Sequence, residues 1–228
     1  MANEILKNEI KAVLFDMDGV IFDTESVWKN AFYKSNKKYG LMLDEEYRQH
    51  KMAGRTEANI RKMMKQEFPD VDIDSYRDYM LNLVVNEIKT SKKLLKNGFV
   101  EIVETLKNNN IKIALATSNS LEMCHILFEN AGLKPEDIFD AIVTKDEVKN
   151  GKPNPDVFLI AAKKLGENPE NAVVLEDSIV GIQAAHNASA IPIMVVDLIE
   201  PDMETRKLTW KVVYSLFDAK DYILGIKV

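Results

Sequence analysis

The chain has 228 residues, a length that suits one large domain or one domain with an insert. Its 30 Lys and Arg residues against 36 Asp and Glu residues give a formal net charge of −6, so it lacks the strongly basic character of nucleic-acid-binding proteins. Hydrophobic residues at 46% and charged residues at 29% are close to globular averages, which excludes extensive disorder. The single cysteine, Cys124, excludes a disulfide framework and favours a reducing compartment. No apolar stretch approaches the roughly 20 residues that span a bilayer, so we expect a soluble, cytoplasmic protein that binds neither nucleic acid nor membrane.

Short apolar runs recur along the chain, each ending at a polar residue, as is typical of strands covered on both faces. In chain order they are Ala12–Phe15, Lys112–Ala116, Ala141–Val143, Ala172–Leu175 and Ile193–Val196. Helical patterns lie between the later runs: an apolar stripe over 99–106, a helix over 121–131, and a helix over 154–165 with Asn154 as its cap. Strands that alternate with helices predict an α/β fold with a Rossmann-like parallel sheet.

The stretch from about residue 24 to residue 93 differs, because it has no strand pattern. It contains three amphipathic helices, which we predict at Glu25–Tyr39, Thr56–Phe68 and Ile73–Lys89. We therefore expect an all-helical cap inserted after the first strand. The predicted domains are an α/β catalytic core over residues 1–22 and 94–228 and a helical cap over residues 23–93.

Polar residues follow the predicted strands at the point where ligands bind in open parallel sheets. The segments concerned are Asp16-Met17-Asp18-Gly19, Thr117-Ser118-Asn119, Glu176-Asp177-Ser178, and Lys152 in the loop after the third strand. Four carboxylates at one end of a sheet repel one another unless a positive charge lies among them, and Mg²⁺ is a hard cation that takes oxygen ligands. Hydroxyl groups and an ammonium group nearby could hold a phosphate. The set predicts a phosphoryl site, where catalysis is mainly positioning and charge neutralisation.

These motifs resemble, in chain order, the four motifs of the haloacid dehalogenase superfamily: Asp16-x-Asp18-Gly19, Thr117-Ser118, Lys152-Pro153-x-Pro155 and Glu176-Asp177. The likeness covers nearly the whole chain, including the helical insert. It is similar to the branch that holds β-phosphoglucomutase and many small-metabolite phosphatases. The resemblance implies that Mg²⁺ is bound by the Asp16 carboxylate, the backbone carbonyl of Asp18 and the Asp177 carboxylate. It implies that Glu176 supports the direct ligands or contacts the metal through a water molecule.

We expect catalytic roles for two carboxylates and one lysine. Asp16 is the expected nucleophile, because carboxylates can form covalent aspartyl-phosphate intermediates. Asp18 is the expected general acid toward the leaving group and then the base toward water. Lys152 is expected to hold the phosphate, together with Thr117 and Ser118, and to neutralise charge around the nucleophile.

Four further residues are candidates for binding phosphate or substrate. Gly19 lets the backbone approach the phosphate closely. Asn119 either contacts the phosphate or caps the helix that follows it. In the cap, Arg55 at a helix start either pairs with a phosphate or carboxylate of the substrate or is simply solvated. Glu25 either contacts a substrate hydroxyl or occupies the first turn of a helix.

Trp28 bears on the choice between two activities. β-Phosphoglucomutases resemble this chain over Phe15–Thr24 but then carry a cap histidine where this sequence has Trp28, and no cap lysine aligns cleanly with theirs. A mutase has to exclude water from its aspartyl-phosphate, so this departure favours a hydrolase, whereas Val20, where many phosphatases have Thr, favours the mutase. We expect a monomeric, Mg²⁺-dependent phosphatase of a small phosphorylated metabolite such as a sugar phosphate. The alternatives are a β-phosphoglucomutase-like mutase and a non-catalytic phosphate-binding module.

Overall fold

A computed structural model describes residues 10–52, 57–91 and 94–225. Contacts within the chain divide it into two compact units. One unit comprises residues 1–23 and 92–228, and the other comprises residues 24–91. We call them the α/β unit and the helical unit and describe each by itself.

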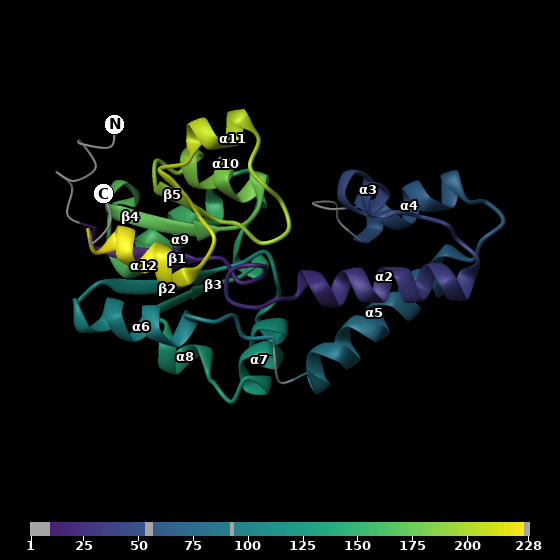
Figure 1. Ribbon diagram of the computed structural model, residues 1–228, viewed down its shortest axis with the longest axis horizontal. Coiled ribbons are helices and arrows are strands. Elements are labelled where there is room, and N and C mark those ends of the chain that lie inside the picture. Colours follow the sequence, from purple (N-terminus) through teal and green to yellow (C-terminus); the bar gives the residue numbers. More distant parts are fainter. Residues whose placement is uncertain (1–9, 53–56, 92–93, 226–228) are drawn as a thin grey trace. The chain divides into compact units, whose positions relative to one another are not determined.

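The α/β unit is built on six parallel strands in the order β3-β2-β1-β4-β5-β6 (Figure 1). The central strand β1 (Ala12–Phe15) pairs with β2 (Lys112–Ala116) on one side and β4 (Ala172–Glu176) on the other. All four residues of β1 are fully buried, which explains why its sequence is a continuous apolar run. The other strands are β3 (Ala141–Val143), β5 (Ile191–Val195) and β6 (Lys211–Val213). The predicted Rossmann-like parallel sheet is confirmed.

Two strands differ from the prediction. β6 has no counterpart in it, because three residues at the edge of the sheet, beginning with a lysine, carry too little apolar pattern to be recognised. β5 begins at Ile191, two residues earlier than predicted. Its second residue is Pro192, and a proline argues against a strand when only the sequence is read, because it has no N–H to donate to a neighbouring strand.

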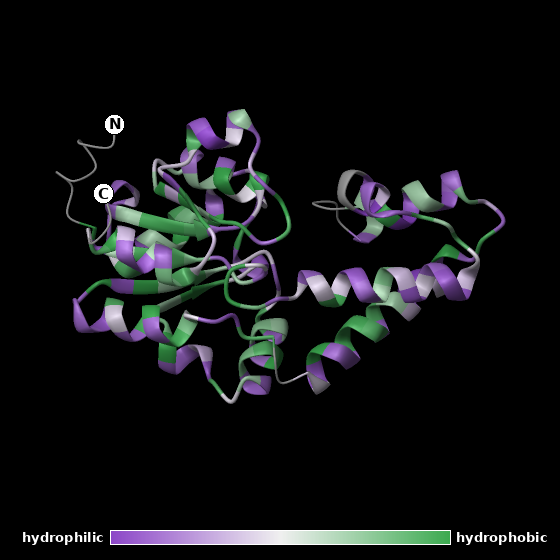
Figure 2. Ribbon diagram, in the orientation of Figure 1, coloured by the Kyte–Doolittle hydropathy of each residue, from purple (hydrophilic) through white to green (hydrophobic). Residues whose placement is uncertain are grey.

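Helices cover both faces of the sheet. On one face, Phe158 and Ala184, from two different helices, pack with Leu14 and Val174 of the sheet. On the other face, the Phe15 ring meets the Phe99 ring edge-to-face with centroids 6.0 Å apart. Figure 2 shows the hydrophobic colouring concentrated along the strands between these layers. The helices are α6 (Phe99–Asn108), α7 (Leu121–Asn130), α8 (Pro135–Ile138), α9 (Asp156–Leu165), α10 (Ile179–Asn187), α11 (Met203–Leu208) and α12 (Leu216–Ile223).

The start of α9 differs from the expected cap. The residue that precedes the helix is Pro155, and the predicted cap Asn154 instead donates its side-chain Nδ2 to the Gly151 carbonyl at 3.0 Å. Asn154 therefore stabilises the loop before the helix, the loop that also carries Lys152.

The helical unit contains α2 (Glu25–Tyr39), α3 (Glu45–Tyr47), a π-helical turn (Arg48–Met52), α4 (Glu57–Glu67) and α5 (Ile73–Thr90). The three predicted helices agree with α2, α4 and α5 to within one residue at each end. The long helices α2 and α5 pack along each other, and between them the buried Tyr76 hydroxyl donates to Asn36 Oδ1 at 2.9 Å. Arg77, only 2% exposed, donates to both carboxylate oxygens of Glu57, at 3.0 and 2.5 Å. This pairing fixes α4 against α5 through a shielded, bidentate contact.

The chain leaves and re-enters the α/β unit through two adjacent segments. Asp23 donates its backbone N–H to the Leu94 carbonyl at 2.8 Å, and Phe22 and Leu95 form an antiparallel bridge. Lys96 continues the pairing by donating its backbone N–H to the Ile21 carbonyl at 2.8 Å. The outgoing and returning segments therefore stabilise each other within the α/β unit.

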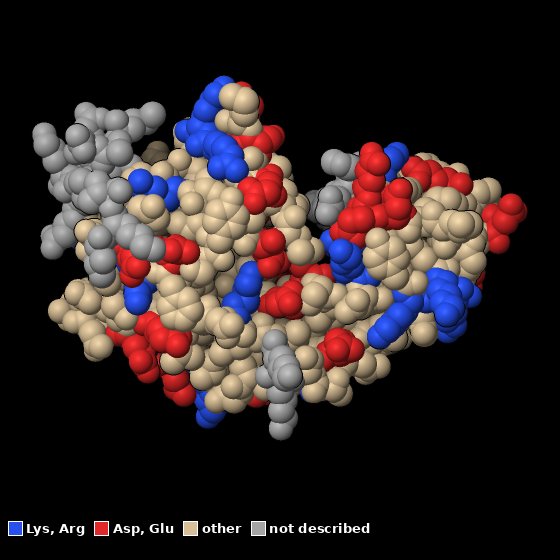
Figure 3. Space-filling model, viewed as in Figure 1, with Lys and Arg blue, Asp and Glu red and all other residues tan. Residues whose placement is uncertain are grey.

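Charged side chains of both signs are interspersed on the face of the α/β unit drawn in Figure 3. Among the described residues, no helix combines the length and the apolar character needed to cross a membrane.

Candidate active site

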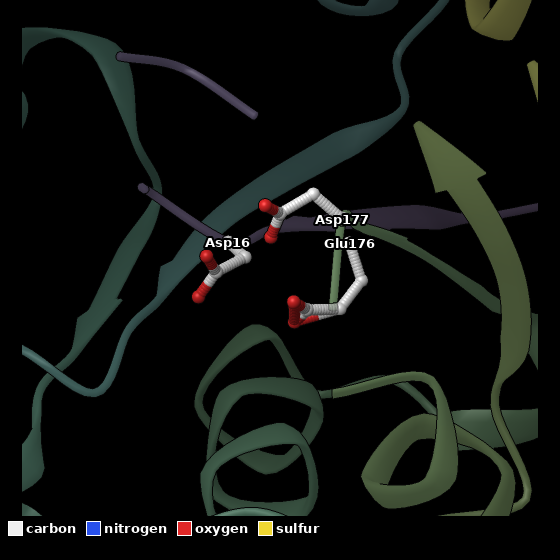
Figure 4. A group of neighbouring side chains, drawn as sticks. All are labelled: Asp16, Glu176 and Asp177. Carbon is white, nitrogen blue, oxygen red and sulfur yellow. The ribbon is translucent and has the colours of Figure 1, made fainter. Parts of the chain in front are cut away.

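The order of the strands places the candidate site between β1 and β4. From β1 the connections lead outward to β2 and β3, and from β4 they lead the other way to β5 and β6, so β1 and β4 flank a switch point. Asp16 directly follows β1, Glu176 is the last residue of β4, and Asp177 follows it. Figure 4 shows their carboxyl groups side by side, and one oxygen from each lies within 4.8 Å of the others. The structure thus brings together three acidic residues predicted to lie at one site.

Lys152 reaches this cluster from the loop before α9. Its Nζ donates to Asp16 Oδ1 at 2.5 Å and to Glu176 Oε2 at 3.0 Å. The side chains of Lys152 and Asp16 are 7% and 8% exposed, so the ion pair is largely shielded from water. Two carboxylates from different strands are therefore held by one ammonium group.

Burial dominates the ionisation of this cluster. It raises the pKa of Asp16 to about 8, against the lowering effect of Lys152 and with further raising by Glu176 and Asp18. Burial alone would lower the pKa of Lys152, but the charges of Asp16 and Glu176 outweigh it and raise that pKa, so the lysine remains an ammonium group. The Asp16 carboxylate consequently needs positive charge beyond that of Lys152 in order to stay ionised at neutral pH.

The donor set fits a hard divalent cation. Three carboxylates lie together and the Lys152 ammonium group pairs with two of them, so oxygen donors and negative charge exceed what this one cation balances. Both oxygens of Glu176 already have protein partners: Oε2 accepts from Lys152, and Oε1 accepts from the Ser178 backbone N–H at 3.1 Å and hydroxyl at 2.8 Å. Glu176 is therefore suited to a supporting role at such a site.

Two glycines make room for these acids. A Cβ on Gly19, whose φ is +72°, would lie 2.0 Å from Asp177 Oδ2, and a Cβ on Gly181 would lie 1.9 Å from Glu176 Oε2. Gly19 was a predicted site residue, with close approach of the backbone as the reason. The sequence interpretation missed Gly181, and it included Ser178 in the segment after the fourth strand without assigning it a role. The available signal was a glycine inside a helical pattern soon after an acidic pair, because such a glycine often has a packing reason.

Asn119 does not cap α7, which corrects one of the two predicted roles. The cap is Ser120, whose hydroxyl accepts from the Met123 backbone N–H at 3.3 Å. Asn119 instead donates its Nδ2 to Asp18 Oδ2 in a short hydrogen bond. The expected general acid and base is thus oriented by a residue that follows β2.

The two hydroxyl residues after β2 differ in exposure. Thr117 is fully buried, and its Oγ1 accepts from the Asn119 backbone N–H at 3.1 Å, which shapes the turn and leaves the hydroxyl proton available for donation. Ser118 is exposed, so its hydroxyl is accessible from solvent. Both remain predicted phosphate-binding groups.

The two predicted substrate residues of the cap have different outcomes. Glu25 occupies the first turn of α2, where its Oε2 accepts from Arg48 Nη1 at 2.9 Å. Arg48 also pairs with Glu45 at 2.7 Å, so Glu25 belongs to an ion-pair network inside the helical unit. Arg55 lies outside the described residues.

Comparison with known proteins agrees with this geometry. A sequence model of the haloacid dehalogenase-like hydrolases matches residues 10–189. A phosphorylated carbohydrates phosphatase of Thermotoga maritima is 34% identical over 182 residues, which are 78% of this chain and 82% of the relative. A fructose-1-phosphate phosphatase of Escherichia coli is 30% identical over 176 residues, which are 77% of this chain and 91% of the relative. A crystal structure of β-phosphoglucomutase from Clostridium difficile is 26% identical, has a TM-score of 0.71, and covers 96% of this chain and 100% of that one.

The family match covers most of the chain and includes all of the described acidic cluster. The resemblance read from the four motifs is thereby confirmed, and the chain belongs to the haloacid dehalogenase-like hydrolases.

Proposed function

We propose that this chain is a Mg²⁺-dependent phosphatase that hydrolyses a small phosphorylated metabolite through an aspartyl-phosphate intermediate. The observation that carries the proposal is the convergence of Asp16, Glu176 and Asp177, the first two of which pair with the Lys152 ammonium group. When bound by Asp16 and Asp177, a Mg²⁺ ion supplies positive charge that offsets the charge of the phosphoryl oxygens.

In the first step, an Asp16 carboxylate oxygen attacks phosphorus and the bond to the ester oxygen breaks. Asp18 gives its proton to that oxygen, which leaves as an alcohol, and the phosphoryl group is now bonded to Asp16. Lys152 donates to the oxygen of Asp16 that does not attack, and so fixes the orientation of the carboxylate. Thr117 and Ser118 are suited to donate to the phosphoryl oxygens.

In the second step, the Asp18 carboxylate takes a proton from water while the water oxygen attacks phosphorus. The bond between phosphorus and Asp16 breaks, which releases inorganic phosphate and restores both aspartates. The hydrogen bond from Asn119 to one oxygen of Asp18 orients the carboxyl group for this proton exchange. Orientation of this kind accounts for much of the rate enhancement in phosphoryl transfer.

The relatives suggest the substrate class. One is named for phosphorylated carbohydrates and another for fructose 1-phosphate, so we propose that this chain acts on a sugar phosphate or a similar ester. A mutase is the second candidate, favoured by the likeness to β-phosphoglucomutase along almost the whole chain. Trp28 favours the phosphatase, since an indole cannot accept a proton in the place of the mutase histidine.

A panel of sugar phosphates and nucleotides, assayed for released phosphate with Mg²⁺ and with excess chelator, tests the proposal. We expect turnover of at least one sugar phosphate, its loss with chelator, and its loss in Asp16→Asn. Incubation of β-glucose 1-phosphate with a bisphosphate primer separates the two candidates, because a mutase yields glucose 6-phosphate with little free phosphate. No turnover anywhere on the panel would favour a non-catalytic phosphate-binding module instead.

A further inference from the structure

The Lys96 side chain joins two loops that are far apart in the sequence. Its Nζ donates to the Gly19 backbone carbonyl at 2.6 Å and to Asp197 Oδ1 at 2.6 Å. Gly19 belongs to the turn after β1, and Asp197 lies just beyond β5. The Lys96 and Asp197 side chains are 23% and 13% exposed, so the ion pair is considerably more shielded than an ordinary surface pair.

Lys96 contacts the turn after β1 at two points. The side chain binds the Gly19 carbonyl, while the backbone N–H of Lys96 donates to the Ile21 carbonyl at 2.8 Å. Inside the turn, the Gly19 N–H donates to the Phe22 carbonyl at 2.8 Å. These bonds fix the peptide groups on both sides of Gly19, and the first of the two contains the Asp18 carbonyl.

The turn has little freedom to shift without disturbing the acidic cluster. Gly19 packs so closely on Asp177 that a single added methyl group would overlap its carboxylate. A rotation of either peptide group beside Gly19 would therefore move Asp177 or the neighbouring Asp18. Displacements of about 1 Å at reacting groups can lower rates by about 100-fold.

The Asp197 carboxylate binds the lysine through one oxygen and leaves its other oxygen without a hydrogen bond from the described residues. Its Oδ1 accepts from Lys96, whereas its Oδ2 is buried and accepts no hydrogen bond from the described residues. A buried acceptor without a partner is costly, so local stability alone gives a poor reason for a carboxylate at this position. A better reason is that the negative charge of Asp197 neutralises the Lys96 ammonium group and fixes its position.

We propose that Lys96, held by Asp197, is a positioning residue of the phosphatase that keeps the turn carrying Asp18 and Gly19 in its catalytic geometry. The inference rests on the proposed function. Among the described residues, the Lys96 ammonium group donates to Gly19 and Asp197 and not to the acidic cluster of Asp16, Glu176 and Asp177, so it acts through the backbone of Gly19.

The test compares Lys96→Met, which removes the ammonium group, with Lys96→Arg, which keeps a donor and the charge. Asp197→Asn keeps the shape of the partner but removes its charge, and it provides a second variant if Lys96→Met does not fold. Lys207→Met is the matched control, because Lys207 makes a 2.6 Å ion pair with Glu204 on the exposed surface of α11. The readouts are kcat and KM for p-nitrophenyl phosphate with saturating Mg²⁺, and hydrogen exchange of the amides of residues 17–22.

We expect Lys96→Met to lower kcat by about tenfold or more while KM changes little, since the substrate-binding groups are untouched. The amides of Gly19, Ile21 and Phe22 should exchange faster, and Asp197→Asn should show a smaller effect of the same kind. Lys96→Arg should recover most of the rate, and Lys207→Met should match the wild type.

A fall in unfolding temperature with unchanged kcat in Lys96→Met would show a purely structural ion pair and overturn the inference. Unchanged exchange over residues 17–22 would overturn it as well, and this result does not depend on activity. If wild-type protein hydrolyses no phosphate ester on the panel, the proposed function fails, while the exchange measurement still decides whether Lys96 holds the turn.

Discussion

Asp18 and Asp16 are separated by one residue but have different partners. Asp16 is deeply buried and pairs with an ammonium group, whereas Asp18 is half-buried and accepts from the neutral amide of Asn119. Two carboxylates in different surroundings can hold different protonation states at one pH, which is what a nucleophile and a general acid require. Because burial raises the pKa of Asp16 to about 8, the proposed division of roles also requires a cation that keeps Asp16 ionised.

Asp18→Asn should lower kcat by about 10²–10⁴-fold, the range expected when a general acid or base is removed. The apparent affinity for Mg²⁺ should change little, because only the backbone carbonyl at this position is the expected ligand. Both quantities come from rates measured across a Mg²⁺ titration, with Asn119→Ala as a control that keeps the carboxylate but removes its orienting amide. Reduced Mg²⁺ affinity with a normal rate would show that the Asp18 side chain binds the metal instead.

At the scale of elements, α10 begins just after the acidic pair Glu176 and Asp177 at the end of β4. Ser178 caps the helix through its hydroxyl, which accepts from the Gly181 N–H at 3.0 Å, and the same hydroxyl donates to Glu176. Gly181, one turn into the helix, leaves the space that the Glu176 carboxylate fills. The start of the helix and the position of the acid are thus determined together.

Gly181→Ala is expected to reduce both stability and activity. A glycine replaced by alanine inside a helix ordinarily stabilises it by about 1 kcal/mol, but here the added methyl group would lie 1.9 Å from Glu176 Oε2 and force the carboxylate off Lys152. Thermal unfolding and kcat measure the two effects. Gly151→Ala is the control, since a Cβ there meets nothing within 4 Å. A Gly181→Ala protein as stable and active as the wild type would mean that Glu176 needs no fixed position.

The elements and the acidic cluster were largely predictable because both follow from local rules. Buried strands reveal themselves as apolar runs, and residues that follow parallel strands converge at one end of the sheet, as Asp16 and Asp177 do. Contacts that depend on the order of strands were not predictable. Asn119 reaches Asp18 because β2 lies beside β1, and Lys96 reaches Asp197 across 101 positions of sequence. No periodic pattern in the chain encodes either pair.

For the whole molecule, the raised pKa of Asp16 links stability to pH and to metal. Between the ordinary value of 3.8 and about 8, the folded metal-free protein holds a proton that the unfolded chain has released. Because the unfolded state binds fewer protons over this range, the contribution of Asp16 to stability falls as pH rises. Lys152 is charged in both states throughout the range and adds no slope there.

We expect the unfolding temperature of metal-free protein to fall from pH 5 to pH 8 more steeply than that of Asp16→Asn, which lacks the titrating group. Mg²⁺ requires the ionised carboxylate, so its affinity should rise by up to about tenfold per pH unit below pH 8. Thermal unfolding with chelator and with graded Mg²⁺ measures both effects. Equal slopes for the two proteins, or Mg²⁺ affinity independent of pH, would show that Asp16 is ionised without metal.

The paired outgoing and returning segments have a consequence for how such a chain can change over time. Because Asp23 and Leu94 are hydrogen-bonded neighbours, the ends of the inserted stretch are already joined within the α/β unit. Any other insert whose own termini lie close together could replace residues 24–91 and leave the register of the sheet unaltered. The α/β unit and the inserted residues 24–91 can therefore change in sequence independently of each other.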